Sequence, residues 1–254
     1  MKDKNKFTKI EIIFVLGCAF FMLLNIGAIG SGGRRRAKEM VCLSNLCQWG
    51  TMFEMFMNDN DGHFNKGWDE GEVGLWMNAL RPYYKDNWAL LLCPEATKTS
   101  SLTGVFAAWF TDVDLPEGGS QNVVGSYGIN SWTNDKTEGG EQHWKNVSEI
   151  EGKNNIPVFL DSTWYDSWPR HTDSPPVYDG DIWAVGSETK HFCINRHNGS
   201  INGLFMDWSV RKIGLKELWT LQWHRSFDTE GPYTKAGGVR PSDWPQWMRN
   251  FKDY

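Results

Sequence analysis

The sequence predicts an α+β protein in which a long N-terminal helix, partly transmembrane, packs on an antiparallel β-sheet domain. An uncharged run of 22 residues lies between Glu11 and Arg34. An apolar stripe with helical spacing follows it, and the rest of the 254-residue chain holds short β-type runs bounded by turn residues. We expect four segments: a basic leader-like segment 1–6, a transmembrane helix 7–33, its amphipathic continuation 34–60, and an extracytoplasmic α+β domain 61–254.

The uncharged run is long enough to cross a bilayer as a helix, because about 20 apolar residues suffice. It ends in "GSGGRRR" and not in a small-residue cleavage site, so we interpret it as retained and not as a secretory signal peptide. Lysines precede it and Arg34–Arg36 follow it, so its flanking charges do not orient it. Glu11 at its entrance is unexpected, since a charge near hydrocarbon is costly.

An apolar stripe predicts that the helix continues to about residue 58. Its members recur at spacings of three and four: Leu43, Leu46, Cys47, Gly50, Phe53 and Met57. The helix should stop at "NDNDG", where Gly62 is free to adopt a left-handed cap. The same letters faintly resemble a calcium loop, but the spacing fails, because Met57 and Trp68 would be the first and twelfth ligands.

The domain 61–254 contains the β-type runs "VVGSYGIN", "IPVFLDST", "SINGLFMDW" and "SVRKI". The letters "INGLFMDWSVRKI" predict a β-hairpin with Asp207 and Trp208 at its turn. "LKELWTLQWHRSF", residues 215–227, predicts a helix, and the stretches 97–122 and 131–154 indicate long loops. A turn-rich and tryptophan-rich tail ends the domain.

Charge is unevenly distributed along the chain. Residues 1–38 hold eight basic and two acidic side chains, so the remainder, with 18 basic and 29 acidic residues, carries a net charge of −11. An acidic domain behind a basic-flanked anchor excludes nucleic acid as an expected partner and fits inner-membrane lipid headgroups instead. The fifteen tryptophans are expected to pack a loop-rich domain, and the alternative is that some stack on sugar rings.

Several segments resemble one bacterial group. "FTKIEIIFVLG" resembles the prepilin-type start of type IV pilins and type II secretion pseudopilins. "VCLSNLCQWGTMFEMFMNDNDGHF" and the "CP" segment at Cys93 are similar to later parts of pseudopilin-like proteins. "HNGSINGLFMD" is similar to their His, nine residues, Asp-Gly pattern, with His197 and Asp207 in place. The chain departs from the group at Lys6, where prepilin peptidases cut after glycine, and at Trp208, where the pattern has its glycine.

The resemblance implies a pilin-like fold for the chain, and it implies a structural subunit and not an enzyme. It implies a single-pass protein of the bacterial inner membrane, with its C-terminal domain outside the cytoplasm, that stacks with copies of itself or other pseudopilins into a type II secretion or type IV pilus-like filament. Prepilin peptidase would cut between Lys6 and Phe7, and the Phe7 amine, open to methylation, would face Glu11 of a neighbouring subunit. Without that cut, Lys9 of a neighbour is the nearest substitute.

Four cysteines lie outside the apolar run: Cys42, Cys47, Cys93 and Cys193. They predict two disulfides and an oxidising compartment. Cys42 and Cys47 would point about 140° apart on the predicted helix with a rise of about 7.5 Å, which excludes a bond between them. Two pairings remain open: Cys42–Cys93 with Cys47–Cys193, or Cys42–Cys193 with Cys47–Cys93. The pseudopilin resemblance favours the first, because it sets Cys42 and Cys93 together.

The sequence contains none of the common catalytic motifs, and we expect neither enzyme activity nor a cofactor. His191 and His197, with Asp161 and Asp207, could form a metal cluster, and calcium is a second option whose ligands no spacing identifies. We favour the structural alternative, in which Asp207 shapes the hairpin turn and His197 hydrogen-bonds a nearby loop. Two other functions stay open beside the assembly subunit: a membrane-tethered polysaccharide-binding module and a metal-dependent hydrolase.

Overall fold

The computed structural model of the protein describes residues 15–17, 30–85, 87–98, 104–148 and 150–254. These residues belong to two units, 1–38 and 39–254. In the first unit, residues 15–17 are helical and helix α2, Ser31–Asp59, begins. The second unit contains the rest of α2 and every strand that the structure describes.

Within the described residues, none of the helices combines the length and the apolar character that a membrane crossing requires. This finding contradicts the predicted single-pass location in a bacterial inner membrane. The leader-like segment 1–6 lies outside the described residues, and so does most of the expected transmembrane helix 7–33.

Helix α2 confirms the helix expected over residues 34–60. From residue 39 onward its buried side chains recur at helical spacing. They are Cys42, Asn45, Leu46, Trp49, Met52, Phe53, Phe56 and Met57. The helix also ends as predicted, because Gly62 has a φ of +80° and its N–H donates to the Met57 carbonyl over 2.7 Å.

Strands of the described chain form one pair and one larger sheet. Strands β1 and β2 are antiparallel, and the other five form a sheet in the order β5-β3-β4-β6-β7. Neighbours in this sheet are antiparallel except β3 and β5, which are parallel, so the sheet is mixed where an antiparallel one was predicted. The strands are β1 Trp109–Asp114, β2 Ser120–Gly125, β3 Tyr127–Asn130, β4 Pro157–Asp161, β5 Asp166–Ser167, β6 Ser200–Phe205 and β7 Val210–Gly214.

Short helices connect these elements. Two are α-helical: α3 Trp76–Ala79 and α4 Arg81–Tyr84. The others are single turns or short runs of 3-10 helix: Gly67–Gly74, Trp88–Leu91, Ser131–Thr133, Lys153–Asn155, Thr189–His191, Leu215–Thr220, Pro241–Asp243 and Gln246–Met248. The α+β class is therefore confirmed.

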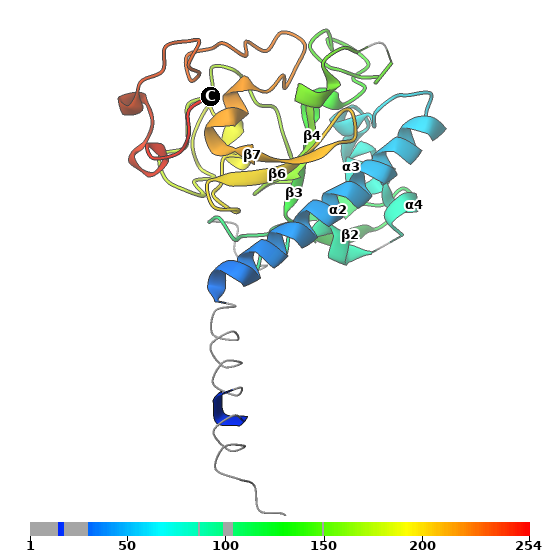
Figure 1. Ribbon diagram of the computed structural model, residues 1–254. Helices are drawn as coiled ribbons and strands as arrows, with labels where there is room; N and C mark the ends of the chain where they lie inside the picture. The colour runs from blue at the N-terminus through cyan, green and yellow to red at the C-terminus, as the bar shows by residue number, and fades with distance from the viewer. Residues whose placement is uncertain (1–14, 18–29, 86, 99–103, 149) are drawn as a thin grey trace, which may run out of the picture. The chain divides into compact units, whose positions relative to one another are not determined.

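The five-stranded sheet is covered on both faces. Residues 39–59 of α2, drawn in blue in Figure 1, cross one face, where Gly50 lies against the Leu204 side chain of β6. Ile201 and Phe205 of the same strand belong instead to the core that the C-terminal tail completes with Trp219 and other tail residues. The alternation along β6 has the period of two expected of a strand buried on both faces.

The tryptophans mainly pack these two cores. Six of them are almost completely buried: Trp49, Trp76, Trp109, Trp219, Trp223 and Trp244. Buried indole N–H groups generally donate to backbone carbonyls, as Trp49 does to Leu90 over 2.8 Å. All fifteen lie in the described part of the chain, and Trp68 and Trp183 are the exposed ones. The packing role predicted for tryptophan is confirmed at the buried positions.

Strands β6 and β7 form the predicted hairpin, with Asp207 and Trp208 at its turn. One carboxylate oxygen of Asp207 accepts hydrogen bonds from the Ser209 N–H over 3.0 Å and the Ser209 hydroxyl over 2.6 Å. Trp208 has a φ of +64°, a left-handed conformation that costs about 1–2 kcal/mol for a residue with a side chain. Its ring stacks on Phe53 of α2, with 6.4 Å between centroids and 11° between planes, which offsets that cost.

Two predictions of local structure are wrong. Residues 215–227 form only the 3-10 helix Leu215–Thr220, because the Gln222 N–H donates to the Asn155 carbonyl over 2.9 Å and so leaves the helical pattern. The stretch 97–122, expected to be a loop, contains β1 and the start of β2. In β1 only Trp109 and Val113 are buried, and this sparse apolar pattern hid the strand.

Candidate functional site: a buried cysteine, aspartate and histidine cluster

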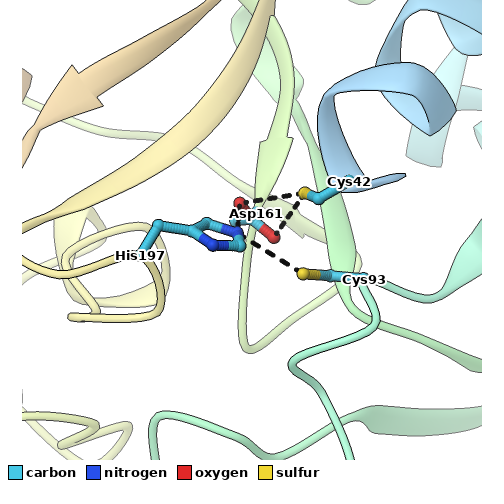
Figure 2. Close-up of side chains that lie close together, drawn as sticks. All are labelled: Cys42, Cys93, Asp161 and His197. Carbon is cyan, nitrogen blue, oxygen red and sulfur yellow. Dashed lines mark hydrogen bonds and ion pairs between the residues drawn. The ribbon is translucent and has the colours of Figure 1, made fainter. Parts of the chain in front are cut away.

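Four buried side chains from four separate segments meet beside the sheet (Figure 2). Cys42 comes from α2, Cys93 from the segment after the 3-10 helix at Trp88–Leu91, Asp161 from the end of β4, and His197 from the loop before β6. No member is more than 4% exposed. Their four ligand atoms lie within 4.8 Å of one another, and no other group of three or more His, Cys, Asp and Glu side chains in the described ranges converges in this way.

Direct contacts link the four side chains into a chain of partners. The Nε2 atom of His197 lies 3.0 Å from Oδ2 of Asp161 and 3.4 Å from the sulfur of Cys93. The Cys42 thiol donates to the same Asp161 oxygen over 3.5 Å. The contacts thus run from Cys42 to Asp161, from Asp161 to His197 and from His197 to Cys93, and Figure 2 shows both sulfurs on the same side of the Asp161–His197 pair.

A buried arginine supports the carboxylate from the other side. Arg196 Nη1 lies 3.3 Å from Oδ1 of Asp161, and neither side chain is exposed. The remaining donors of this guanidinium are held by backbone carbonyls: those of Val105, Ala107, Ser126 and Ser162. The Asn202 N–H donates to Asp161 Oδ2 over 2.9 Å, so the carboxylate is held in place through both oxygens.

The charges in the cluster fix the ionisation of Asp161 and His197. Burial raises the pKa of Asp161, but the opposite charges of His197 and Arg196 outweigh burial and lower that pKa to about 2. Burial lowers the pKa of His197, but the carboxylate of Asp161 outweighs burial and raises it to about 10. The pair is therefore an aspartate and an imidazolium at neutral pH.

The two thiols differ in how readily they ionise. Burial raises the pKa of Cys42 well above its ordinary value, with Cys93 and Asp161 acting in the same direction and the Asn202 side chain opposing them. Burial also raises the pKa of Cys93, but hydrogen bonds with Cys42 and His197 and the charge of Arg196 outweigh it, so this pKa is lowered. Cys93 is thus the more readily ionised of the two.

The structure brings together only part of the metal cluster that the sequence suggested. Asp161 and His197 do meet, but Asp207 lies in the exposed hairpin turn and is not among the converging ligands. His191 lies beside Thr163, whose hydroxyl is 3.3 Å from its Nδ1 atom, and burial lowers the pKa of His191 to about 4. We expected His197 to hydrogen-bond a nearby loop, but its Nε2 atom contacts the Asp161 carboxylate at the end of β4 and the sulfur of Cys93.

The predicted disulfides are absent, because Cys42, Cys47, Cys93 and Cys193 all carry free thiols. Cys47 faces solvent on α2, whereas the Cys193 thiol is buried against the sulfur of Met248 at 3.8 Å, so they are not paired. Cys42 and Cys93 are near neighbours, as the resemblance implied, yet each thiol contacts the Asp161–His197 pair. The sequence pattern therefore identified the neighbours but not their chemical partners.

The predicted assembly and cleavage residues, Lys6, Phe7, Lys9 and Glu11, lie outside the described residues. An open cleft at the end of α2 is lined by Asp59, Asn60 and Asp61 of the "NDNDG" segment, but the contacts of its carboxylates do not favour a calcium site. There Asp135 is paired with Lys66 over 2.6 Å, and Asp59 accepts the Tyr83 hydroxyl over 2.8 Å. These carboxylates already have donors that a calcium ion would have to displace.

The cluster offers two sulfurs, one imidazole and one carboxylate, which are all metal-ligand types. Because its members are buried, a substrate cannot reach these groups without the fold opening. No protein-family model, curated protein or solved structure matches the chain. The function must therefore be argued from the described residues.

Proposed function

We propose that this protein is a non-catalytic assembly subunit, of the kind that the pseudopilin resemblance implies, and that it associates with copies of itself through the exposed face of α2. The observation that carries the proposal is the near absence of charge on that face. We define the face by the exposed residues of α2 from Met40 to the helix end: Met40, Val41, Ser44, Cys47, Gln48, Thr51, Glu54, Met55, Asn58 and Asp59.

Only two of these ten side chains, Glu54 and Asp59, are charged, and Asp59 lies at the end of the helix. A helix with one buried stripe ordinarily carries charged side chains on its opposite face. Here the face presents large apolar side chains to solvent instead, since Met40 is 64% exposed and Val41 and Met55 are each 49% exposed. Such a surface is typical of a helix that contacts another protein.

Charge also favours a copy of the chain as the partner on this face. The part of the chain after residue 38 carries a net charge of −11, so two copies repel each other over most of their surfaces. That repulsion is weakest where uncharged faces meet. A symmetric dimer or a stacked array would place the α2 faces, or an α2 face and a second uncharged surface, in contact.

The buried cluster supports a structural role and not catalysis. Cys42 belongs to α2 and Asp161 to β4, so their contact fastens the helix to the sheet. Catalytic groups need access to substrate, and no member of this cluster is more than 4% exposed. The polysaccharide-binding alternative stays an untested prediction, with Trp68 and Trp183 as the exposed tryptophans that it would use.

Cys47 makes the contact testable, because it lies within the face and its thiol is exposed while those of Cys42, Cys93 and Cys193 are buried. Mild oxidation of the full-length protein should yield a covalent dimer linked through Cys47, and Cys47→Ser should abolish it. Peptide mapping of the dimer identifies the linked residue. A protein that stays monomeric in sedimentation at all concentrations, without a Cys47 link, would contradict the proposal.

A matched pair of charge insertions tests the same face without chemistry. Ser44→Glu adds a charge to the α2 face, and Ser242→Glu adds one to an exposed serine of the C-terminal tail. We expect Ser44→Glu to weaken self-association at least about tenfold, the equivalent of about 1.4 kcal/mol, and Ser242→Glu to leave it unchanged. Equal behaviour of the two variants would place the contact elsewhere.

A further inference from the structure

We propose that Cys42, Cys93, Asp161 and His197 bind one zinc ion, which fastens α2 to the β-sheet. This inference is independent of self-association, since it concerns the interior of the domain. It rests on the geometry of the four ligand atoms, on their charge balance and on a buried amide beside them.

All four ligand atoms lie within 4.8 Å of one another, and three of their six separations are close to the edges of a tetrahedral zinc site. Zinc–ligand distances of about 2.3 Å to sulfur and about 2.1 Å to nitrogen or oxygen give edges of about 3.8 Å between two sulfurs, about 3.6 Å from sulfur to nitrogen or oxygen, and about 3.4 Å from nitrogen to oxygen. The measured separations are 3.5 Å from Cys42 Sγ to Asp161 Oδ2, 3.4 Å from Cys93 Sγ to His197 Nε2, and 3.0 Å from His197 Nε2 to Asp161 Oδ2. An ion at the centre therefore needs these contacts to lengthen by no more than about 0.4 Å.

The donor set selects zinc over calcium or magnesium. Two thiolates with one imidazole suit zinc, whereas calcium and magnesium take oxygen ligands. The four segments that supply the ligands are fixed by the fold: a helix, the segment at Cys93, the end of a strand and the loop before β6. A closed set of four protein ligands is typical of structural zinc and not of catalytic zinc, which keeps an open position.

The charges of the site balance when zinc is bound. A divalent ion held by two thiolates, one carboxylate and a neutral imidazole leaves one net negative charge. The guanidinium of Arg196, 3.3 Å from the second oxygen of Asp161 and without solvent exposure, neutralises that charge. A buried cluster is tolerated when its charges cancel and its hydrogen bonds are satisfied, and the zinc-bound cluster together with Arg196 meets the first condition.

Neighbouring hydrogen-bond donors are placed for a thiolate at Cys42. The Tyr127 hydroxyl donates to the Cys42 sulfur over 3.3 Å. Asn202 is completely buried, its side chain lowers the pKa of Cys42, and its side-chain nitrogen and oxygen have no other hydrogen-bond partner within the described residues. A metal-bound thiolate is a stronger acceptor than a thiol, and donors of this kind commonly support ligating sulfurs.

Two other states of the same residues compete with zinc. A disulfide between Cys42 and Cys93 would use both sulfurs and bring them to about 2.05 Å, which excludes a metal. A metal-free network of thiols around the Asp161–His197 ion pair is the second. The metal content separates the zinc-bound state from the other two, and the number of free thiols separates the disulfide from the metal-free network.

The decisive experiment uses the full-length protein, purified without chelator. Elemental analysis should find one zinc per chain. After removal of the zinc, cobalt should bind at one per chain and give the visible absorption of a tetrahedral site together with a sulfur-to-cobalt charge-transfer band. These measurements need no variant, so they test the proposal even if ligand substitutions prevent folding.

Paired variants identify the ligands. Cys93→Ser should weaken metal binding more than about 100-fold and reduce the charge-transfer band, whereas Cys193→Ser, at a buried thiol outside the cluster, should change neither. Asp161→Asn and Asp207→Asn form a second pair with the same expected contrast. Asn202→Ala should weaken binding about 10–100-fold, as expected for a residue that supports a ligand.

Three results would overturn the proposal. The first is a protein that binds neither zinc nor cobalt and has free thiols at Cys42 and Cys93. The second is a Cys42–Cys93 peptide in non-reducing mapping of protein kept free of added oxidant. The third is a stoichiometric metal that survives both Cys93→Ser and Asp161→Asn.

Discussion

The Nε2 atom of His197 lies 3.0 Å from Oδ2 of Asp161, and neither side chain is more than 1% exposed. Arg196 extends this contact to the other carboxylate oxygen. Such a group is not held together by burial, because taking each ion out of water costs several kcal/mol. Its members depend on one another, so the loss of one leaves the others buried and unpaired.

Asp161→Asn is therefore expected to destabilise the protein strongly. The substitution keeps the shape of the side chain but leaves the charges of His197 and Arg196 without a carboxylate. We expect the free energy of unfolding to fall by about 3–5 kcal/mol. Urea unfolding in the presence of a chelator measures this value without a contribution from bound metal.

Asp207→Asn is the control for that prediction. Asp207 accepts hydrogen bonds only within its exposed turn, from Ser209, so its replacement should cost no more than about 1 kcal/mol. Similar losses of unfolding free energy in the two variants would mean that the Asp161–His197 contact contributes no more to stability than the hydrogen bonds of an exposed turn.

A second prediction concerns Trp208, which adopts a φ of +64° where the group pattern has glycine. Trp208→Gly removes a backbone cost of about 1–2 kcal/mol. It also removes the ring that stacks on Phe53, and burial of a large aromatic side chain is worth about 1.5–3 kcal/mol, with about 0.5–1.5 kcal/mol more from the ring pair. We expect a net loss of stability of about 1–2 kcal/mol in urea unfolding.

A double-mutant cycle separates the two effects. With Phe53→Leu in the background, Trp208→Gly should cost less, because the ring pair is already lost. If Trp208→Gly stabilises the wild-type protein instead, the strain of the turn exceeds the value of the ring contact.

Local patterns predicted the elements that position the site. The spacing of Leu46, Phe53 and Met57 indicated α2, and the sequence around Asp207 indicated the β6–β7 hairpin. In both cases the signal is contained within a short window of sequence. The parallel pairing of β5 with β3 was not predictable in this way, because β5 is only two residues long.

The cluster was only partly predictable, because its members come from four distant segments. Sequence spacing grouped His197 with Asp207, yet Asp207 follows the end of β6, in the exposed turn, and cannot return to the cluster. Cys42 and Cys93 were expected to be neighbours. The contact of Cys42 with Asp161 and that of Cys93 with His197 depend on how distant segments pack together, which no local pattern encodes.

A third prediction follows from the exposure of the cysteines. Of the thiols that the structure describes, Cys47 is exposed and Cys42, Cys93 and Cys193 are buried. Under native conditions a maleimide should label Cys47 at least about 100-fold faster than the other three, because labelling of a buried thiol requires local opening. Mass spectrometry of peptides from a labelling time course measures the rates. Equal rates at Cys47 and Cys193 would contradict the packing of the tail core.

The last prediction uses Asp166, a buried carboxylate on β5. Burial raises the pKa of Asp166 from its ordinary value of 3.8 to about 6, and the charge of Glu188 acts in the same direction, although the Trp68 N–H, 2.8 Å from Oδ2, opposes them. Between about pH 4 and pH 6 the folded protein therefore keeps a proton that the unfolded chain releases. The stability that this group contributes is present below pH 4 and is lost as pH rises through 6.

Asp166→Asn, which stays neutral, should exceed the wild type in free energy of unfolding by about 2–3 kcal/mol at pH 7 and match it near pH 4. Urea unfolding across this range measures the difference, with Asp112→Asn on β1 as a matched exposed control. A constant difference between Asp166→Asn and the wild type from pH 4 to pH 7 would show that Asp166 does not titrate in this window.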